Sequence, residues 1–142
     1  MSVIYLDHNG TTAVDPRVVE ATLPYLSQHF GNPSTQSVYG QAARAGLDRA
    51  RAQVAEFLGC SSQEVVFTSG ATESNNWVLQ GVVAAYRGDG KPHLVVSQVE
   101  HPSVGKTADF LEQHGRAEVT RVGVDGWGRI RVEEVLQALK PN

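Results

Sequence analysis

A run of small residues near the middle of the chain has the make-up of a phosphate-binding turn. Residues 67–76 read Phe-Thr-Ser-Gly-Ala-Thr-Glu-Ser-Asn-Asn, which predicts a strand that ends in a turn and opens a helix. Backbone N–H groups at a helix start have no partner within the helix, so they bind anions readily. Gly70 and Ala71 are small enough for a ligand to approach the backbone, and Thr72 adds a hydroxyl donor. The alternative is an ordinary capped helix start, where the same residue types are common.

An imidazole follows the next apolar segment. The sequence Val99-Glu100-His101-Pro102 comes directly after a strand expected over residues 94–97. His101 then lies at the carboxyl end of a strand, which is where open α/β sheets bind their ligands. A loop histidine without a role is the alternative, because the chain has five histidines. Together the two motifs predict a phosphate cradle and a flat ring that converge on one ligand.

These motifs resemble those of the pyridoxal-phosphate enzymes of the cysteine desulfurase and selenocysteine lyase family, within the class-V aminotransferases. Three other stretches agree with that family in order and spacing, namely residues 5–12, 31–34 and 124–130. The resemblance implies an α/β fold of the aspartate-aminotransferase type, pyridoxal-phosphate fold type I. It also implies that residues 1–15 are an N-terminal arm or small-domain segment. Residues 16–142 would be the N-terminal part of the large, cofactor-binding domain.

The resemblance assigns roles to four residues. Gly70, Ala71 and Thr72 match the family positions that bind the phosphate of pyridoxal 5'-phosphate. His101 matches the residue that stacks on the pyridine ring, where it is also a candidate proton relay and therefore a candidate catalytic residue. No metal is implied, and a single cysteine excludes a multi-cysteine zinc site.

The elements that must position these residues alternate along the chain. Helices are expected over residues 16–26, 37–58, from the turn at Gly70 to about residue 86, 103–114 and 132–140. Strands are expected over residues 64–68, 94–97 and 118–124, with a further short strand before Asp7. This alternation predicts a parallel sheet flanked by helices. The helix that carries Trp77, Val78 and Val82 is apolar on most faces, so we expect it to be largely buried.

The resemblance also implies that the sheet is incomplete. In the family, the strand matching residues 64–68 lies at one side of the sheet and the strands matching 94–97 and 118–124 lie at the other. The strands between them come later in longer chains. Free apolar strand edges invite pairing with another chain, so we expect a homodimer or a complementing C-terminal polypeptide as a partner.

Composition excludes other classes of function. The 142 residues include 12 basic and 15 acidic side chains, for a formal charge of −3, and these are spread without blocks. This pattern argues against a nucleic-acid partner and against a basic membrane patch. There is no apolar stretch long enough for a transmembrane helix and no signal segment, so we expect a cytoplasmic protein.

Two groups that the family chemistry requires are not found in the expected contexts. Pyridoxal phosphate needs a lysine for its Schiff base, and Lys91, Lys106 and Lys140 all lie outside the family's Ser-x-His-Lys context. Cys60 lies well before the position of the family's catalytic cysteine, so we expect Cys60 to be a small buried or neutral residue and not the nucleophile. The chain alone is therefore expected to be inactive, with both groups supplied from elsewhere.

Three readings of function stay open. The resemblance implies removal of sulfur from L-cysteine, which gives L-alanine and an enzyme-bound persulfide for a sulfur acceptor, as in iron–sulfur cluster assembly. Selenocysteine lyase activity is the near alternative. A reading from a different class is a non-catalytic remnant that acts as a dimerisation or interaction module, or as a plain phosphate-binding module.

Overall fold

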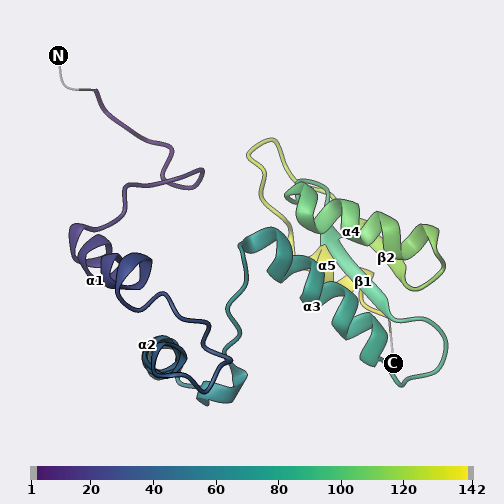
Figure 1. Ribbon diagram of the computed structural model, residues 1–142. Coiled ribbons are helices and arrows are strands. Elements are labelled where there is room, and N and C mark those ends of the chain that lie inside the picture. Colours follow the sequence, from purple (N-terminus) through teal and green to yellow (C-terminus); the bar gives the residue numbers. More distant parts are fainter. Residues whose placement is uncertain (1–2, 141–142) are drawn as a thin grey trace. The chain divides into compact units, whose positions relative to one another are not determined.

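The computed structural model describes residues 3–140, which divide into two compact units between Val66 and Phe67 (Figure 1). The first unit is helical. The second contains the only sheet that the described residues form. Among residues 3–140, no helix is both long enough and apolar enough to cross a membrane.

The first unit is built from two helices whose ends carry clear signals in the sequence. Helix α1 (Pro16–Ser27) starts after Asp15, whose carboxylate accepts the N–H of Arg17, and it continues through Pro24. Helix α2 (Val38–Leu58) starts after Ser37 and ends at Gly59. Gly59 has a φ of 69°, a left-handed conformation that glycine adopts without a steric penalty. The predicted bounds of both helices are confirmed to within two residues.

The two helices of this unit approach closely at one glycine. The ring of Tyr25 in α1 lies against Gly46 of α2, where an added Cβ would be 2.3 Å from a ring carbon. Helix α2 is followed by a single 3-10 turn, η1 (Ser62–Glu64), which is closed by a capping box between Ser61 and Glu64. Few side chains are buried, and α1 buries none. The first unit therefore has little core of its own.

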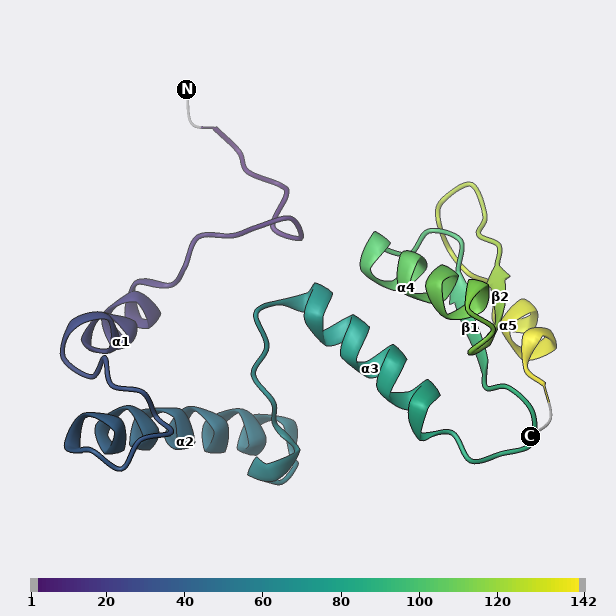
Figure 2. The same ribbon diagram turned by 45° about the vertical axis from the view of Figure 1, so that its right-hand side comes forward.

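The second unit is a β-α-β arrangement with one helix before it and one after it. In chain order it contains α3 (Ala71–Ala85), β1 (His93–Ser97), α4 (Pro102–Gln113), β2 (Glu118–Val122) and α5 (Val132–Ala138). The two strands are parallel, and their register pairs His93 with Glu118 and Ser97 with Val122. Figure 2 shows the strands between α4 and α5. A small parallel sheet flanked by helices confirms the predicted fold class.

The core of this unit lies between α3, α4 and the sheet. Leu111 of α4 is fully buried, and it forms a cluster with Val83 of α3 and Ala117 at the start of β2. Leu79 and Leu94 pack against this cluster. Because α3 contributes to the same cluster as α4, its first turn and the start of α4 belong to one packed unit.

Two expected strands are not formed. Residues 65–68 follow the 3-10 turn that ends at Glu64 and belong to neither strand of the sheet; residues 3–6, before Asp7, are likewise irregular. A strand exists only as part of a ladder, and β1 and β2, the strands of the described region, pair with each other. The expectation of strands at these two places was therefore wrong.

The expectation that α3 is largely buried was also wrong. Val83 is its one buried residue, whereas Trp77, Val78 and Val82 are 55%, 63% and 58% exposed. One face of α3 packs against the cluster around Leu111, and no element of the second unit covers the other face. The sequence pattern identified an apolar helix correctly, but the second unit does not contain the layer needed to bury its second face.

Candidate functional site

The first turn of α3 offers free backbone donors. Its N-cap is Gly70, which makes no side-chain capping bond. The first N–H bond of the helix runs from Ser74 to the carbonyl of Gly70. The N–H groups of Ala71 and Thr72 donate to no group among residues 3–140. A Cβ added at Gly70 would meet no atom within 4 Å, so the space beside this helix start is open.

The carboxylate of Glu73, in the same first turn of α3, bonds back to the preceding loop. Glu73 accepts the N–H of Ser69 at 2.6 Å and the Ser69 hydroxyl at 2.8 Å. These two bonds, the backbone one foremost, hold the pKa of Glu73 below its ordinary value. The charged group thereby orders the loop that leads into α3, where a negative charge also interacts favourably with the helix dipole.

His101 is the N-cap of α4 and is held through one ring nitrogen. Its Nδ1 accepts the N–H of Ser103 at 3.1 Å and lies 2.8 Å from the Ser103 hydroxyl. Pro102 occupies the first helical position, where proline is favoured because no N–H is needed. The histidine that the sequence singled out is therefore placed by the start of a helix, with its orientation set by the backbone of that helix.

A chain of hydrogen bonds joins α3 to α4 beside this ring. Asn75 donates from Nδ2 to the hydroxyl of Ser103 at 2.9 Å, and Asn76 accepts at Oδ1 from the hydroxyl of Thr107 at 2.9 Å. Ser103 and Thr107 are 7% and 6% exposed. The two asparagines belong to the predicted phosphate-binding motif, but the motif predicts no role for them or for Ser103 and Thr107. The signal that could have found them is the spacing of Ser103 and Thr107, which places both on one face of α4.

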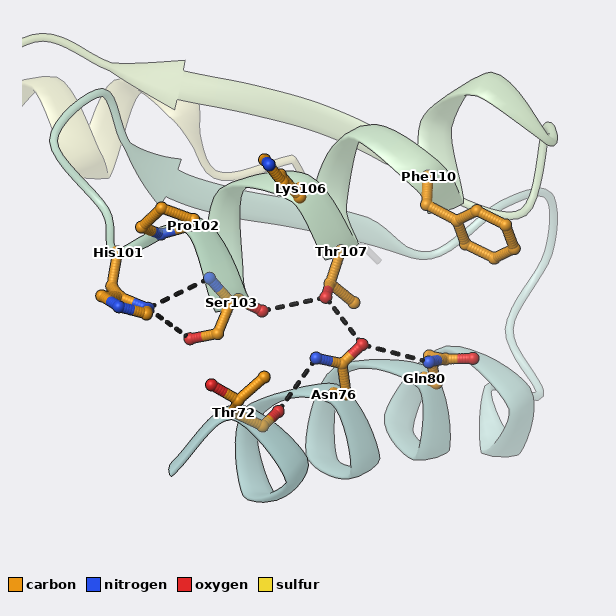
Figure 3. A pocket seen from close by; sticks show the side chains of 9 residues that line it. All are labelled: Thr72, Asn76, Gln80, His101, Pro102, Ser103, Lys106, Thr107 and Phe110. Atoms are coloured by element: carbon orange, nitrogen blue, oxygen red, sulfur yellow. Dashed lines mark hydrogen bonds between the residues drawn. The ribbon is translucent and has the colours of Figure 1, made fainter. Parts of the chain in front are cut away.

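A hollow of about 530 Å³ lies along the junction of these two helices (Figure 3). Thr72 and His101 both line it, so two of the four predicted site residues lie on one cavity. Gly70 and Ala71 are not among its lining residues and form the helix start next to Thr72. Lys106 and Phe110 also line it, although no role was predicted for either.

Another hollow lies in the first unit, along α1 and α2, and carries none of the predicted site residues. No cluster of three or more His, Cys, Asp or Glu side chains gathers in residues 3–140 in a way that would hold a metal ion. Cys60 is free and half-buried just after α2. The chemistry of the described chain is therefore concentrated where α3 and α4 begin.

The family model described as Aminotransferase class-V matches residues 4–142. The chain belongs to the class-V aminotransferase family. The family predicted from the sequence motifs is thereby confirmed. Its members use pyridoxal phosphate, which couples a phosphate to a flat pyridine ring.

Curated relatives of this class-V aminotransferase chain are named cysteine desulfurases. The mitosomal cysteine desulfurase of Encephalitozoon cuniculi is 43% identical over 141 residues, which is 98% of this chain and 32% of that protein. Human cysteine desulfurase is 42% identical over 140 residues, which is 98% of this chain and 30% of that protein. The chain therefore spans about a third of the length of the curated relatives it matches.

Solved structures agree with these relatives. A NifS-like protein superposes with a TM-score of 0.83 at 35% identity, over 92% of this chain and 35% of that one. SspA in complex with cysteine superposes with a TM-score of 0.85 at 36% identity, over 97% of this chain and 39% of that one. The described fold of this chain is thus the N-terminal part of a NifS-like fold.

The described residues fit the two ends of the family cofactor. Free N–H groups at Ala71 and Thr72 and open space beside Gly70 suit a phosphate. The imidazole of His101 lines the same hollow as Thr72 and supplies a flat ring for stacking. When bound, the cofactor supplies an electron sink for bond cleavage at the substrate.

Proposed function

We propose that this chain is the phosphate-holding and ring-covering portion of a pyridoxal-phosphate-dependent cysteine desulfurase. The observation that carries the proposal is that Thr72 and His101, from two separate motifs, line one hollow. The names of the relatives support cysteine as the substrate. In this proposal sulfur leaves L-cysteine as a persulfide on the enzyme and L-alanine is released.

The roles of the chain's own residues follow from their positions. The N–H groups of Ala71 and Thr72 and the Thr72 hydroxyl bind phosphate at the positive end of α3. His101 stacks on the pyridine ring and excludes water from one of its faces. Gly70 contributes space, since a side chain there would occupy the volume beside the phosphate.

The remaining groups belong to a complementing partner in this proposal. A second polypeptide, or the rest of a longer enzyme, supplies the Schiff-base lysine and the nucleophilic cysteine. The exposed apolar face of α3, with Trp77, Val78 and Val82, is a surface that such a partner would cover. The proposal also includes a homodimer and a protein that accepts the sulfur. It places the protein in the cytoplasm, in iron–sulfur cluster assembly. It takes residues 1–15 as an N-terminal arm or small-domain segment.

The same exposed face favours a second candidate, a non-catalytic module that binds full-length relatives through α3. The two candidates differ in whether cofactor chemistry takes place in the assembled complex. Selenocysteine lyase activity is tested in the same assay, by offering selenocysteine in place of cysteine.

Native mass spectrometry of the purified protein with added pyridoxal phosphate is the first experiment. A complex that contains a second polypeptide and the cofactor, shows a borohydride-reducible absorption band, and releases alanine from cysteine would support the desulfurase. In that complex T72V and H101A should weaken cofactor binding. T22V, which removes a hydroxyl from the exposed face of α1, should leave it unchanged. Bare chain or its homo-oligomers, without cofactor, would mean that the 142 residues are a fragment or a remnant, and would overturn the proposal for this chain.

A further inference from the structure

His101 presents its two ring nitrogens to different surroundings. Nδ1 faces two groups of Ser103, whereas Nε2 has no hydrogen-bond partner among residues 3–140. In a neutral imidazole one nitrogen carries the proton and the other is an acceptor, and the partner of one nitrogen decides which. The surroundings of Nδ1 therefore decide what Nε2 can do.

The direction of the bonds at Nδ1 follows from a backbone donor and from the amide of Asn75. A backbone N–H is always a donor, so the N–H of Ser103 at 3.1 Å requires Nδ1 to be the acceptor. Asn75 donates from its amide to the Ser103 oxygen at 2.9 Å, which leaves the Ser103 hydroxyl proton for Nδ1 at 2.8 Å. Figure 3 shows the two bonds from Nδ1 to Ser103. The two donors of Ser103 thus share the one lone pair of Nδ1, and Nδ1 is the unprotonated nitrogen of the neutral ring.

Burial makes this arrangement rigid. Ser103 is 7% exposed, and its carbonyl shares the hydroxyl proton of Thr107, one turn later, with the side-chain oxygen of Asn76. Asn75 comes from the other helix, so the bond that it donates ties the orientation of the Ser103 hydroxyl to the packing of α3 against α4. A hydroxyl bonded on one side by Asn75 and on the other by His101 has less freedom to rotate than that of a surface serine.

We infer that Ser103 and Asn75 are positioning residues that hold His101 as the Nε2–H tautomer, so that the neutral ring offers its ligand a hydrogen-bond donor and no acceptor. The neutral ring in this form donates from Nε2 and does not remove a proton there. If the proposed function holds, His101 then acts on bound cofactor and substrate as a stacking ring and donor. The tautomer itself requires no cofactor, so its test is separate from that of the proposed function.

The test is a long-range proton–nitrogen NMR spectrum of the 142-residue chain with labelled histidine, at a pH where imidazoles are neutral. H101Q identifies the His101 signals by their loss. We expect Nδ1 of His101 to show the shift of an unprotonated nitrogen and Nε2 that of a protonated one, at the limit for a single tautomer. His29, whose ring contacts Tyr25 and makes no hydrogen bond to residues 3–140, should show exchange-averaged shifts.

An isosteric variant tests the role of Asn75. In N75D the carboxylate accepts the Ser103 hydroxyl proton, so Nδ1 loses its hydroxyl donor, and the His101 shifts should move away from the single-tautomer limit. S103A should move them in the same direction, and S103T, which keeps a hydroxyl, should restore them. N32D is the matched control, because Asn32 already uses its side-chain oxygen as an acceptor, from the N–H of Ser34 at 2.9 Å.

Three results would overturn the inference. The first is a protonated Nδ1 in the unmodified chain. The second is a His101 signal as averaged as that of His29. The third is a single-tautomer signal that stays unchanged in both N75D and S103A, since the backbone N–H would then be sufficient and neither side chain would position the ring. Loss of folded signals in S103A leaves N75D to decide, because Asn and Asp have nearly the same shape.

Discussion

The hydroxyl of Thr107 in α4 lies 2.9 Å from the side-chain oxygen of Asn76 in α3, and this bond crosses the junction that forms the candidate site. The same hydroxyl lies 2.9 Å from the carbonyl of Ser103. Thr107 is buried, so its hydroxyl has little access to water. The packing of α3 on α4 therefore depends on a polar contact as well as on the apolar cluster around Leu111.

T107V should weaken the second unit, because it leaves the oxygen of Asn76 without this donor while it keeps the shape of the side chain. A net loss of about 1 kcal/mol in the free energy of unfolding is expected for one such bond. Urea unfolding followed by tryptophan fluorescence measures it, since Trp77 and Trp127 both lie in the second unit. T22V should change the stability by less than about 0.5 kcal/mol. Equal effects of the two variants would show that the contact between Thr107 and Asn76 contributes nothing.

L111A should be the most damaging single truncation in the second unit. Leu111 is fully buried at the centre of the cluster with Val83 and Ala117. Removing a buried leucine side chain costs about 2–5 kcal/mol, part of which is the cavity left behind. The same fluorescence experiment applies, with L136A on α5 as control because Leu136 is 62% exposed. A loss at Leu111 no larger than that at Leu136 would contradict the placement of the core.

R121Q should loosen the attachment of α4 to the sheet. The guanidinium of Arg121 in β2 bonds to the carboxylates of Glu112 and Asp109 in α4. Both bonds raise the pKa of Arg121, and the bond to Glu112 has the larger effect. The Arg121 side chain is 36% exposed, so solvent screens the pair. Each pair should contribute roughly 0.2–1 kcal/mol.

A double-mutant cycle of R121Q with E112Q isolates that contribution from other effects of each change. The coupling energy between Arg121 and Glu112 should be stabilising at low salt, and its size should decrease as salt is added. A coupling energy of zero at low salt would show that the ion pair does not hold α4 to β2.

Glu73 should make the start of α3 sensitive to acid. Its pKa in the folded chain lies below the ordinary value of 4.5, with the Ser69 N–H as the main cause. Its stabilising effect is therefore complete above that ordinary value, and it disappears as the pH falls through the lower, folded value. Urea midpoints measured from neutral pH into acid should show this loss in the unmodified chain.

Two variants apportion this effect of pH. E73Q should remove this component of the pH dependence, because an amide does not titrate in this range. S69A should reduce it in part, since the variant keeps the N–H donor of residue 69 and loses the hydroxyl. A pH profile for E73Q that superimposes on that of the unmodified chain would contradict the role given to Glu73.

The helix ends could be read from the sequence because their signals are local. Asp15 before Pro16 and Ser37 before Val38 mark helix starts, and Gly59 marks a helix end, in each case through a bond or a backbone angle that involves only nearby residues. Strands cannot be read this way. Val65 and Val66 have the composition of a strand, but a strand also needs a neighbouring strand, and in the described residues β1 and β2 pair with each other.

The family and the motif residues of the candidate site were also available from the sequence. The run through Gly70 and Thr72 and the position of His101 after an apolar strand predict a phosphate and a flat ring from residue types and spacing alone. The assignment of Gly70, Ala71, Thr72 and His101 to pyridoxal phosphate stays a prediction, as do the domain boundary at residue 15 and the cytoplasmic location.

What the sequence determined by itself is therefore local: residue types, helix ends and the motifs of a family. The tertiary structure alone decided that Asn75 of α3 donates to Ser103 of α4, and that Ser103 holds Nδ1 of His101. The bond between Asn75 and Ser103 joins segments far apart in the chain, and it forms because the cluster of Leu111, Val83 and Ala117 brings α3 onto α4. The bond between Ser103 and His101 is local, but the contact with Asn75 orients the hydroxyl that makes it. The physical reason is that the chemical form of an imidazole depends on its neighbours in space, and packing, which no local pattern encodes, decides those neighbours.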